Sequence, residues 1–358
     1  MRFQRRWFGS AGLALTMVVG LARDARAIVI FSTGLTTPET ISQAPIGFGD
    51  LGGSYLIADV GANTIWEVPH AGGAPVAFAG DPNQRLAGGI FLPSGWGANS
   101  GSFLVVGETM NVPIPTGIVN FYDAAGHVTQ VAAPVTQFTT PAIAPAGFGA
   151  FAGQVIITGQ TGVVYAFDQG GNFSLVATTS TDFSFRNFGI AFAPSGWGSV
   201  AGEMLVSNAN DGRIDAIDAS GNVTPFATLP IDPAFGLRQM AFAPAGFLPG
   251  YGSLLFVSVS GSGGGGGTLG DVLAVDSSGK VVSSLREDLG LTKFNPRGLL
   301  FTDDGSLLIS DTSDPIYLVT PADFQAVPEP GSLVLLAGGL AAAATAWGRR
   351  RFPTRAAR

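Results

Sequence analysis

Residues 188–227 read FGIAFAPSGWGSVAGEMLVSNANDGRIDAIDASGNVTPFA, and this stretch decides the fold. Apolar runs at 190–193, 204–207, 214–217 and 223–227 are separated by clusters of Gly, Pro, Asn and Asp. Runs of this length are typical of β-strands and too short for α-helices. The breaks supply residues that suit tight turns between antiparallel strands. The stretch therefore predicts one four-stranded, up-and-down sheet.

The same unit recurs along the chain. A proline ahead of a Gly-aromatic turn stands at positions 45, 93, 145, 194 and 244, and a sixth copy without the aromatic lies at 303–305. Such a sheet cannot bury both faces alone, so neighbouring copies must stack on it. Six copies of about 50 residues are typical of a closed all-β, six-bladed propeller. A β-solenoid is the alternative. We expect blades at 40–80, 86–132, 137–178, 185–228, 236–285 and 294–322.

Two further features support a closed ring. The first five copies each place one aromatic beside the turn, and we expect these side chains to pack one blade on the next rather than to form a sugar-stacking ring. They are Phe48, Trp96, Phe148, Trp197 and Phe247. Residues 28–31 form a short β-type run, which we expect to complete the last blade beside the strand ending near Leu318, because closure removes an open edge.

The strand endings resemble a known family. Residues 301–311 (FTDDGSLLISD) and 55–59 (YLIAD) resemble the NHL-repeat and gluconolactonase-like six-bladed propellers, in which a turn Gly precedes a strand ending in Asp or Asn. The resemblance covers residues 28–324 and implies the propeller architecture. It also implies a divalent ion held at the axis by a Glu, Asn and Asp set, although no residue-by-residue match to that set exists here. The candidate calcium ligands are Asp59, Asn208, Asp311 and Glu108, with turn formation as the alternative.

Composition excludes several chemistries. The chain has no cysteine, which excludes disulfides, thiolate catalysis, zinc-cysteine sites and iron-sulfur clusters. The only histidines are His70 and His127, both expected in turns, so no Ser-His-Asp arrangement can be assembled. Residues 28–324 hold eight basic and 23 acidic residues, a net charge of −15, which disfavours nucleic acid as a partner.

Half of those eight cations share one register. Counted back from the marker proline or from Asp303, two arginines lie at −8 and two at −6, and even offsets place side chains on one side of an extended strand. We expect Arg85, Arg186, Arg238 and Arg297 near one mouth of the channel. A cluster there could hold an anionic ligand such as a uronic sugar or a carboxylate, and an anionic carbohydrate is the expected partner. Ion pairing between blades is the alternative.

The N-terminus carries an export signal. Arg2, Arg5 and Arg6 precede an apolar run at 11–21, and Ala25-Arg26-Ala27 has the small-x-small form of a cleavage site. Residues 1–27 are therefore interpreted as a signal peptide with a helical core, cleaved at Ala25 to Ala27. The Arg5-Arg6 pair partly resembles a twin-arginine signal, so both export routes stay open.

The C-terminus, residues 325–358, carries a second signal. Pro328-Glu329-Pro330 leads into an apolar run at 331–347 and then Arg349, Arg350 and Arg351. Seventeen helical residues span about 25 Å, just short of the thickness of a typical hydrocarbon core. The order resembles the PEP-CTERM sorting signal, which implies a Gram-negative exported protein processed by an exosortase at the Pro-Glu-Pro triplet. A plain transmembrane anchor is the alternative.

The functional hypothesis follows from these parts. We expect an exported propeller at the cell envelope or in the extracellular matrix that acts as a binding module rather than as an enzyme. The alternatives are a divalent-metal-dependent, lactonase-like hydrolase and a purely structural matrix component. Propellers host all three kinds of function, so the fold does not separate them.

Overall fold

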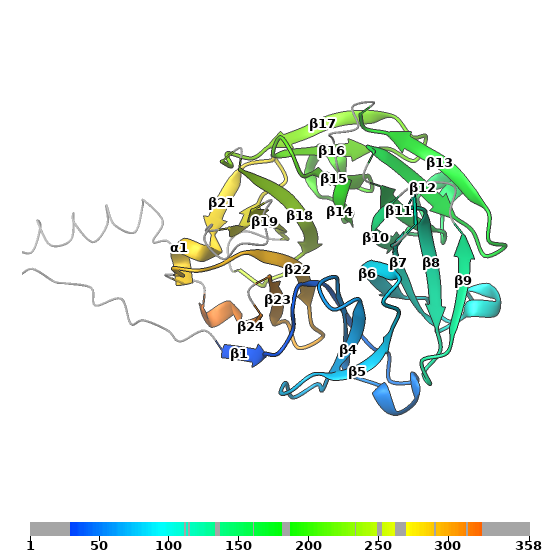
Figure 1. Cartoon of the computed structure of the whole chain (residues 1–358). Coiled ribbons are helices and arrows are strands. Elements are labelled where there is room, and N and C mark those ends of the chain that lie inside the picture. The colour runs from blue at the N-terminus through cyan, green and yellow to red at the C-terminus, as the bar shows by residue number, and fades with distance from the viewer. Residues whose placement is uncertain are drawn as a thin grey trace, which may run out of the picture.

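The computed structural model describes residues 29–323 except 111, 114, 133–136, 160, 181–186, 233, 249–252, 262–269, 290 and 313. Six four-stranded antiparallel sheets surround a central axis (Figure 1). The predicted six-bladed propeller is confirmed, and the solenoid alternative is wrong. The predicted signal helix at 1–27 and membrane span at 331–347 lie outside the described residues. Within the described part of the chain, no helix has the length and apolar character that a membrane crossing needs.

Each blade is built from strands in chain order, from the axis outwards. Blades one and two contain β2 (Pro38–Gln43), β3 (Tyr55–Asp59), β4 (Thr64–Val68), β5 (Val76–Gly80), then β6 (Gln84–Phe91), β7 (Phe103–Thr109), β8 (Gly117–Tyr122), β9 (Val128–Ala132). Blades three and four contain β10 (Phe138–Ile143), β11 (Val155–Gly159), β12 (Val163–Phe167), β13 (Phe173–Thr178), then β14 (Asn187–Phe192), β15 (Met204–Asn208), β16 (Arg213–Ile217), β17 (Val223–Thr228). Blades five and six contain β18 (Phe235–Phe242), β19 (Leu255–Gly261), β20 (Asp271–Val275), β21 (Val281–Ser284), then β22 (Pro296–Phe301), β23 (Leu307–Asp311), β24 (Ile316–Val319).

The N-terminal strand closes the ring. Strand β1 (Val29–Ser32) pairs antiparallel with β24, with Val29 opposite Leu318. It therefore supplies the outer strand of blade six, as predicted, and the two ends of the described chain meet in one sheet. Asp314 strengthens this seam, because its carboxylate accepts the backbone N–H groups of Gly34 and Leu35.

The connections between strands divide the ring into two rims. What we call the loop rim holds the links from second to third strands and from each blade to the next. The turn rim holds the links from first to second and from third to fourth strands. Because Val29 begins β1 opposite the end of β24, the described chain starts and ends at the turn rim. The Gly-aromatic turns also lie there, four of them followed by the short 3-10 helices η1 (Gly49–Leu51), η2 (Gly97–Asn99), η3 (Gly149–Phe151) and η4 (Gly198–Val200).

The repeated aromatic side chains join neighbouring blades. All five are buried, with at most 4% of the residue surface exposed. The Trp96 indole donates to the Gly153 carbonyl of the next blade, and Trp197 donates to Ser253. The three phenylalanines make edge-to-face contacts with rings of the next blade: Phe48 with Phe91, Phe148 with Phe192 and Phe247 with Phe301. Packing between blades is confirmed, and these rings form no sugar-stacking surface.

A β-bulge interrupts every first strand at the same place. The register shifts at the position six residues before the turn marker, so the first strand holds one extra residue there. The residues at this position are Glu39, Ala87, Thr139, Phe188, Arg238 and Arg297. In four blades a hydroxyl on the second strand holds the bulge and also bonds the first strand of the next blade: Thr158, Ser207, Ser258 and Ser310.

Ser207 offers a test of these hydroxyl links. Its Oγ accepts the Gly189 N–H at 2.7 Å and donates to the Arg238 carbonyl at 2.6 Å, wholly out of solvent. We expect Ser207→Ala to reduce the free energy of unfolding by about 1–3 kcal/mol, because two buried backbone groups lose their partner. Denaturant unfolding measures this loss. Ser199→Ala, at an exposed serine of the same blade, is the control, and an equal loss in both variants would contradict the role of the hydroxyl.

Candidate functional site at the channel mouth

Bulge residues of five blades line one pocket at the axis. Glu39, Ala87, Thr139, Phe188 and Arg238 all contribute to it. The enclosed space measures about 20 Å³, enough for one water molecule or one small polar group, and it opens to solvent at its mouth. Val60 and Gln137, which belong to connections at the loop rim, also line it. The pocket therefore lies inside the ring near the loop rim, on the opposite side from the chain ends.

The structure brings three of the four predicted arginines to this region. Arg85 and Arg238 line the pocket directly, and Arg297 binds the carboxylate of Glu39, which also lines it. Arg186 lies outside the described residues. Each of the three described arginines has a different environment, which determines what it can do.

Arg297 is held in a buried ion pair across the closing seam. Its Nη1 donates to Oε1 of Glu39, and only 8% of Arg297 and 9% of Glu39 are exposed. Because β22 belongs to blade six and β2 to blade one, this contact links the two blades that close the ring. Interblade pairing, the alternative role for these arginines, therefore describes Arg297, although its partner is a glutamate rather than an aspartate.

Arg85 is the most accessible of the three. Its Nη1 lies 3.4 Å from Oε1 of Glu108, directly opposite on β7, and 41% of its side chain is exposed. Gln137 donates to the same Glu108 oxygen at 2.7 Å. The long Arg85 contact in a solvated setting contributes little to stability. The guanidinium can therefore turn toward a ligand without disrupting the core.

Arg238 is buried and held by an aromatic ring. Its guanidinium carbon lies 4.1 Å from the ring centroid of Phe188 on the preceding blade. Such cation–π contacts fix the plane and position of a guanidinium. Phe188 thereby holds the Arg238 guanidinium beside the pocket. A search for charged residues alone does not find this contact, because one of the two bulge residues is a phenylalanine.

Thr40 adds an uncommitted polar group. It follows Glu39 at the bulge of β2, lines the pocket and is 4% exposed, yet its hydroxyl has no hydrogen-bond partner among the described residues. A buried hydroxyl without a partner is costly, so such groups are normally satisfied by water or a ligand. Sequence analysis missed Glu39, Thr40, Gln137 and Gln239. Counting back from the marker proline selected the arginines at even offsets. The same count selects Glu39, six residues before Pro45, when it is applied to every residue type rather than to cations.

Three of the four candidate calcium ligands accept hydrogen bonds from the backbone of loops at the same rim. The Asp59 carboxylate accepts four backbone N–H groups, from Thr36, Thr37, Gly61 and Ala62. Asp311 accepts the Asn295 N–H, and Asn208 accepts the Asn210 N–H. Asp59 and Asn208 thus bond the backbone of the turns that follow their strands, as the turn-forming alternative expects, whereas Asp311 bonds the connection before β22. In the described ranges, no three His, Cys, Asp or Glu side chains are grouped so that they could hold a metal. Calcium binding stays a prediction.

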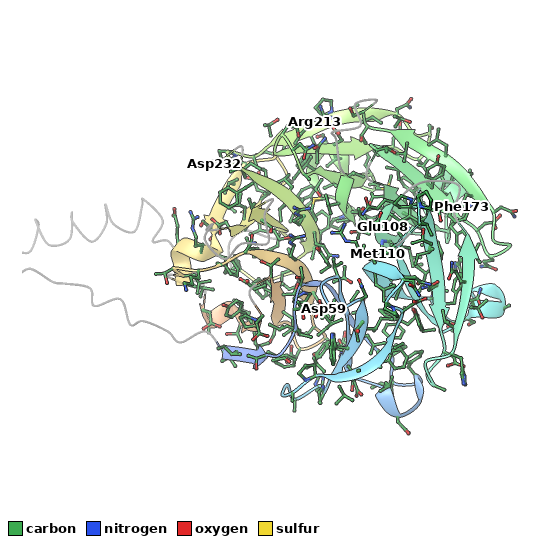
Figure 2. All side chains as sticks on the ribbon, viewed as in Figure 1. Asp59, Glu108, Met110, Phe173, Arg213 and Asp232 are labelled. Atoms are coloured by element: carbon green, nitrogen blue, oxygen red, sulfur yellow. The ribbon has the colours of Figure 1, made fainter. Side chains whose placement is uncertain are left out.

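A fourth arginine at this rim lies apart from the pocket. Arg213 places Nε 2.9 Å from Oδ1 of Asp215, a carboxyl that is 2% exposed. Burial raises the pKa of Asp215, and the charge of Arg213 counteracts only part of this shift. Figure 2 shows Arg213 toward the periphery of the ring, whereas Asp59 and Glu108 lie closer to its centre. Arg213 therefore stabilises a buried acid rather than the channel mouth.

Comparison with known sequences identifies the C-terminal signal. Residues 326–351 match the PEP-CTERM protein-sorting motif. The chain carries a PEP-CTERM sorting signal. This match includes Pro328, Glu329, Pro330 and the arginines at 349–351, all outside the described residues. A PEP-CTERM motif implies an exported protein that an exosortase sorts at the cell envelope. No curated protein matches the chain.

Comparison with solved structures supports the fold. A gluconolactonase from Xanthomonas campestris superposes with a TM-score of 0.55 at 12% identity, over 82% of this chain and 89% of that one. A streptogramin B lyase gives 0.52 at 13% identity, over 82% and 97%. A Trichoderma reesei carbohydrate-active enzyme of family AA12 gives 0.50 at 13% identity, over 83% and 96%. At such identities the likeness shows the propeller fold alone.

Proposed function

We propose that this PEP-CTERM protein is a binding module of the cell surface or extracellular matrix, and that its channel-mouth pocket takes the carboxylate of an anionic carbohydrate. The observation that carries the proposal is the convergence of the Arg85 and Arg238 guanidinium groups and the Thr40 hydroxyl on one axial pocket. Guanidinium groups recognise carboxylates with paired, charge-assisted hydrogen bonds. A uronic sugar supplies such a carboxylate.

The remaining polar groups suit a sugar. The amides of Gln137 and Gln239 and the hydroxyls of Thr139 and Thr140 line the same pocket, and both group types donate to and accept from sugar hydroxyls. Glu39 is the one carboxylate among the described residues that line the pocket, and its Oε1 accepts a hydrogen bond from Arg297. Its commitment to this ion pair supports binding over hydrolysis.

Isothermal titration with a uronic oligosaccharide and its neutral counterpart tests the proposal. We expect Arg85→Gln to weaken binding of the uronic ligand about tenfold, because one charge-assisted hydrogen bond is lost. The melting temperature should not change, since the Arg85 side chain is 41% exposed. Thr40→Val should also weaken binding while leaving stability unchanged or higher, because the lost hydroxyl has no protein partner.

Lys293→Gln is the matched control. It removes one positive charge from an exposed position in the loop-rim connection before β22, and this position does not line the pocket. We expect it to leave affinity unchanged. Equal affinity for the neutral sugar, or unchanged affinity in Arg85→Gln, would contradict the proposal. Hydrolysis of a sugar lactone in the presence of calcium would favour the hydrolase, and no binding of any uronic ligand would favour the structural role.

A further inference from the structure

The turn rim has a regular contact between neighbouring blades. At four seams the turn between first and second strands packs tightly on the third-to-fourth-strand turn of the next blade. A Cβ at Gly49 would lie 2.9 Å from the Ala124 Cβ, and one at Gly149 would lie 3.0 Å from the Ala219 carbonyl oxygen. Gly97 and Gly198 approach Gln169 and Ser277 in the same way. The Gly-aromatic turn and its short helix thus fill the space between blades.

The seam between blades six and one departs from this pattern on both sides. Blade six has only the short turn at 302–306, without the aromatic and without the 3-10 helix. Blade one replaces the Asp-led turn of blades two to five with Pro69-His70-Ala71-Gly72-Gly73. The structure has a pocket of about 250 Å³ at this seam, whereas the four seams described above are filled. Its size approaches the lower end of small-molecule sites, about 300–1,000 Å³.

Aromatic rings form one side of the seam pocket. Tyr55 is 2% exposed, stacks on His70 with ring centroids 5.8 Å apart, and contacts Phe31 edge-to-face at 5.5 Å. Its hydroxyl lies 3.3 Å from Nδ1 of His70. Val29 and Ile30 of β1 add an apolar wall and are more than half exposed.

A carboxylate completes the lining. Asp304 accepts hydrogen bonds from the Thr302 hydroxyl and the Ser306 N–H, and these bonds lower its pKa, so it is ionised at neutral pH. Burial, and then the charges of Asp304 and Asp303, raise the pKa of Tyr55. The aromatic side of the pocket therefore lies in a negative field.

The whole turn rim strengthens that field. Its described turns carry Asp50, Asp123, Asp168, Glu203, Asp218, Asp276, Asp303 and Asp304. Of the described cations, Lys280 alone belongs to a turn of this rim, while the arginines lie at or near the loop rim. A rim of one sign concentrates ligands of the opposite charge near its pockets.

We propose that the seam pocket binds an organic ammonium ion, with the ammonium against Asp304 and the exposed His70 ring, which is stacked on Tyr55, and with its alkyl part against Val29 and Ile30. Aromatic faces beside a carboxylate form the arrangement that attracts alkylammonium groups through cation–π and ionic contacts. The site is independent of the channel mouth, since it lies at the other rim and shares no lining residue with it.

Titration of the full chain with choline, and with its neutral isostere 3,3-dimethylbutan-1-ol, tests the proposal. We expect choline to bind at least tenfold more tightly than the isostere. Asp304→Asn keeps an acceptor for Ser306 and Thr302 but removes the charge, and should weaken choline binding about tenfold. Ala71→Phe, at an exposed lining residue, should fill the pocket and abolish binding without lowering the melting temperature.

Asp168→Asn serves as the control, because Asp168 is an exposed carboxylate of the same rim that does not line the pocket. It should leave choline affinity unchanged. Equal binding of choline and the isostere, wild-type affinity in Asp304→Asn or Ala71→Phe, or no choline binding at all would overturn the proposal.

Discussion

Replacing Glu39 with leucine is expected to destabilise the protein by about 3–5 kcal/mol, because the Arg297 charge would remain buried without its partner. The contact joins blades six and one, so the loss falls on the seam that closes the ring. Chemical denaturation measures the change in free energy. Hydrogen exchange in β1 and β24 should rise first, since these strands join the ends of the chain.

A double variant distinguishes the contribution of the ion pair to stability from the contribution of the volume that the two side chains fill. Replacing a buried pair with apolar residues of similar size is often neutral or stabilising. We therefore expect Glu39→Leu with Arg297→Met to regain most of the stability lost in Glu39→Leu alone. If the double variant were as unstable as the sum of both single variants, the two side chains would be acting independently, and the proposed coupling across the seam would be wrong.

Trp197→Ala is expected to cost about 3–5 kcal/mol, the range for truncating a large buried aromatic residue. The indole is 4% exposed, packs on Phe226 and Phe242 and donates to the Ser253 carbonyl of blade five at 3.0 Å. Its removal leaves a cavity between blades four and five and an unpaired carbonyl. Thermal and denaturant unfolding both measure the loss.

Trp197→Phe is the matched comparison. It keeps an aromatic ring of the kind found at the equivalent Phe148, but it removes the hydrogen bond and some volume. We expect a loss of about 1–2 kcal/mol, smaller than for alanine. Equal losses in both variants would mean that the hydrogen bond to Ser253, rather than ring packing, holds this seam.

The fold was predictable because each blade repeats the same local signals. The strands of all six blades begin within about two residues of the predicted blade starts, from β2 at Pro38 to β22 at Pro296. Short apolar runs between turn residues determine strand length locally, and a constant repeat determines that successive sheets stack. The pairing of β1 with β24 followed from the need to cover the last open edge.

The channel-mouth pocket was only partly predictable. The even offsets of Arg85 and Arg238 reflect strand alternation, which is local. The roles of the arginines depend on partners far away in sequence: Arg297 pairs with Glu39, and Arg238 stacks on Phe188. The bulges that contain Arg238 and Arg297 are shifts in the pairing register of two strands. The sequence of one strand does not predict such a shift.

By itself, the sequence determined the number of blades, their approximate starts, the closing strand and the C-terminal sorting signal, because each of these depends on residues close together in the chain. Only the tertiary structure decided which side chains face each other. It assigned Asp59 to backbone N–H groups, Arg297 to a buried partner and His70 to a pocket beside Asp304. The reason is that ring closure brings blade one against blade six and joins residues more than two hundred positions apart.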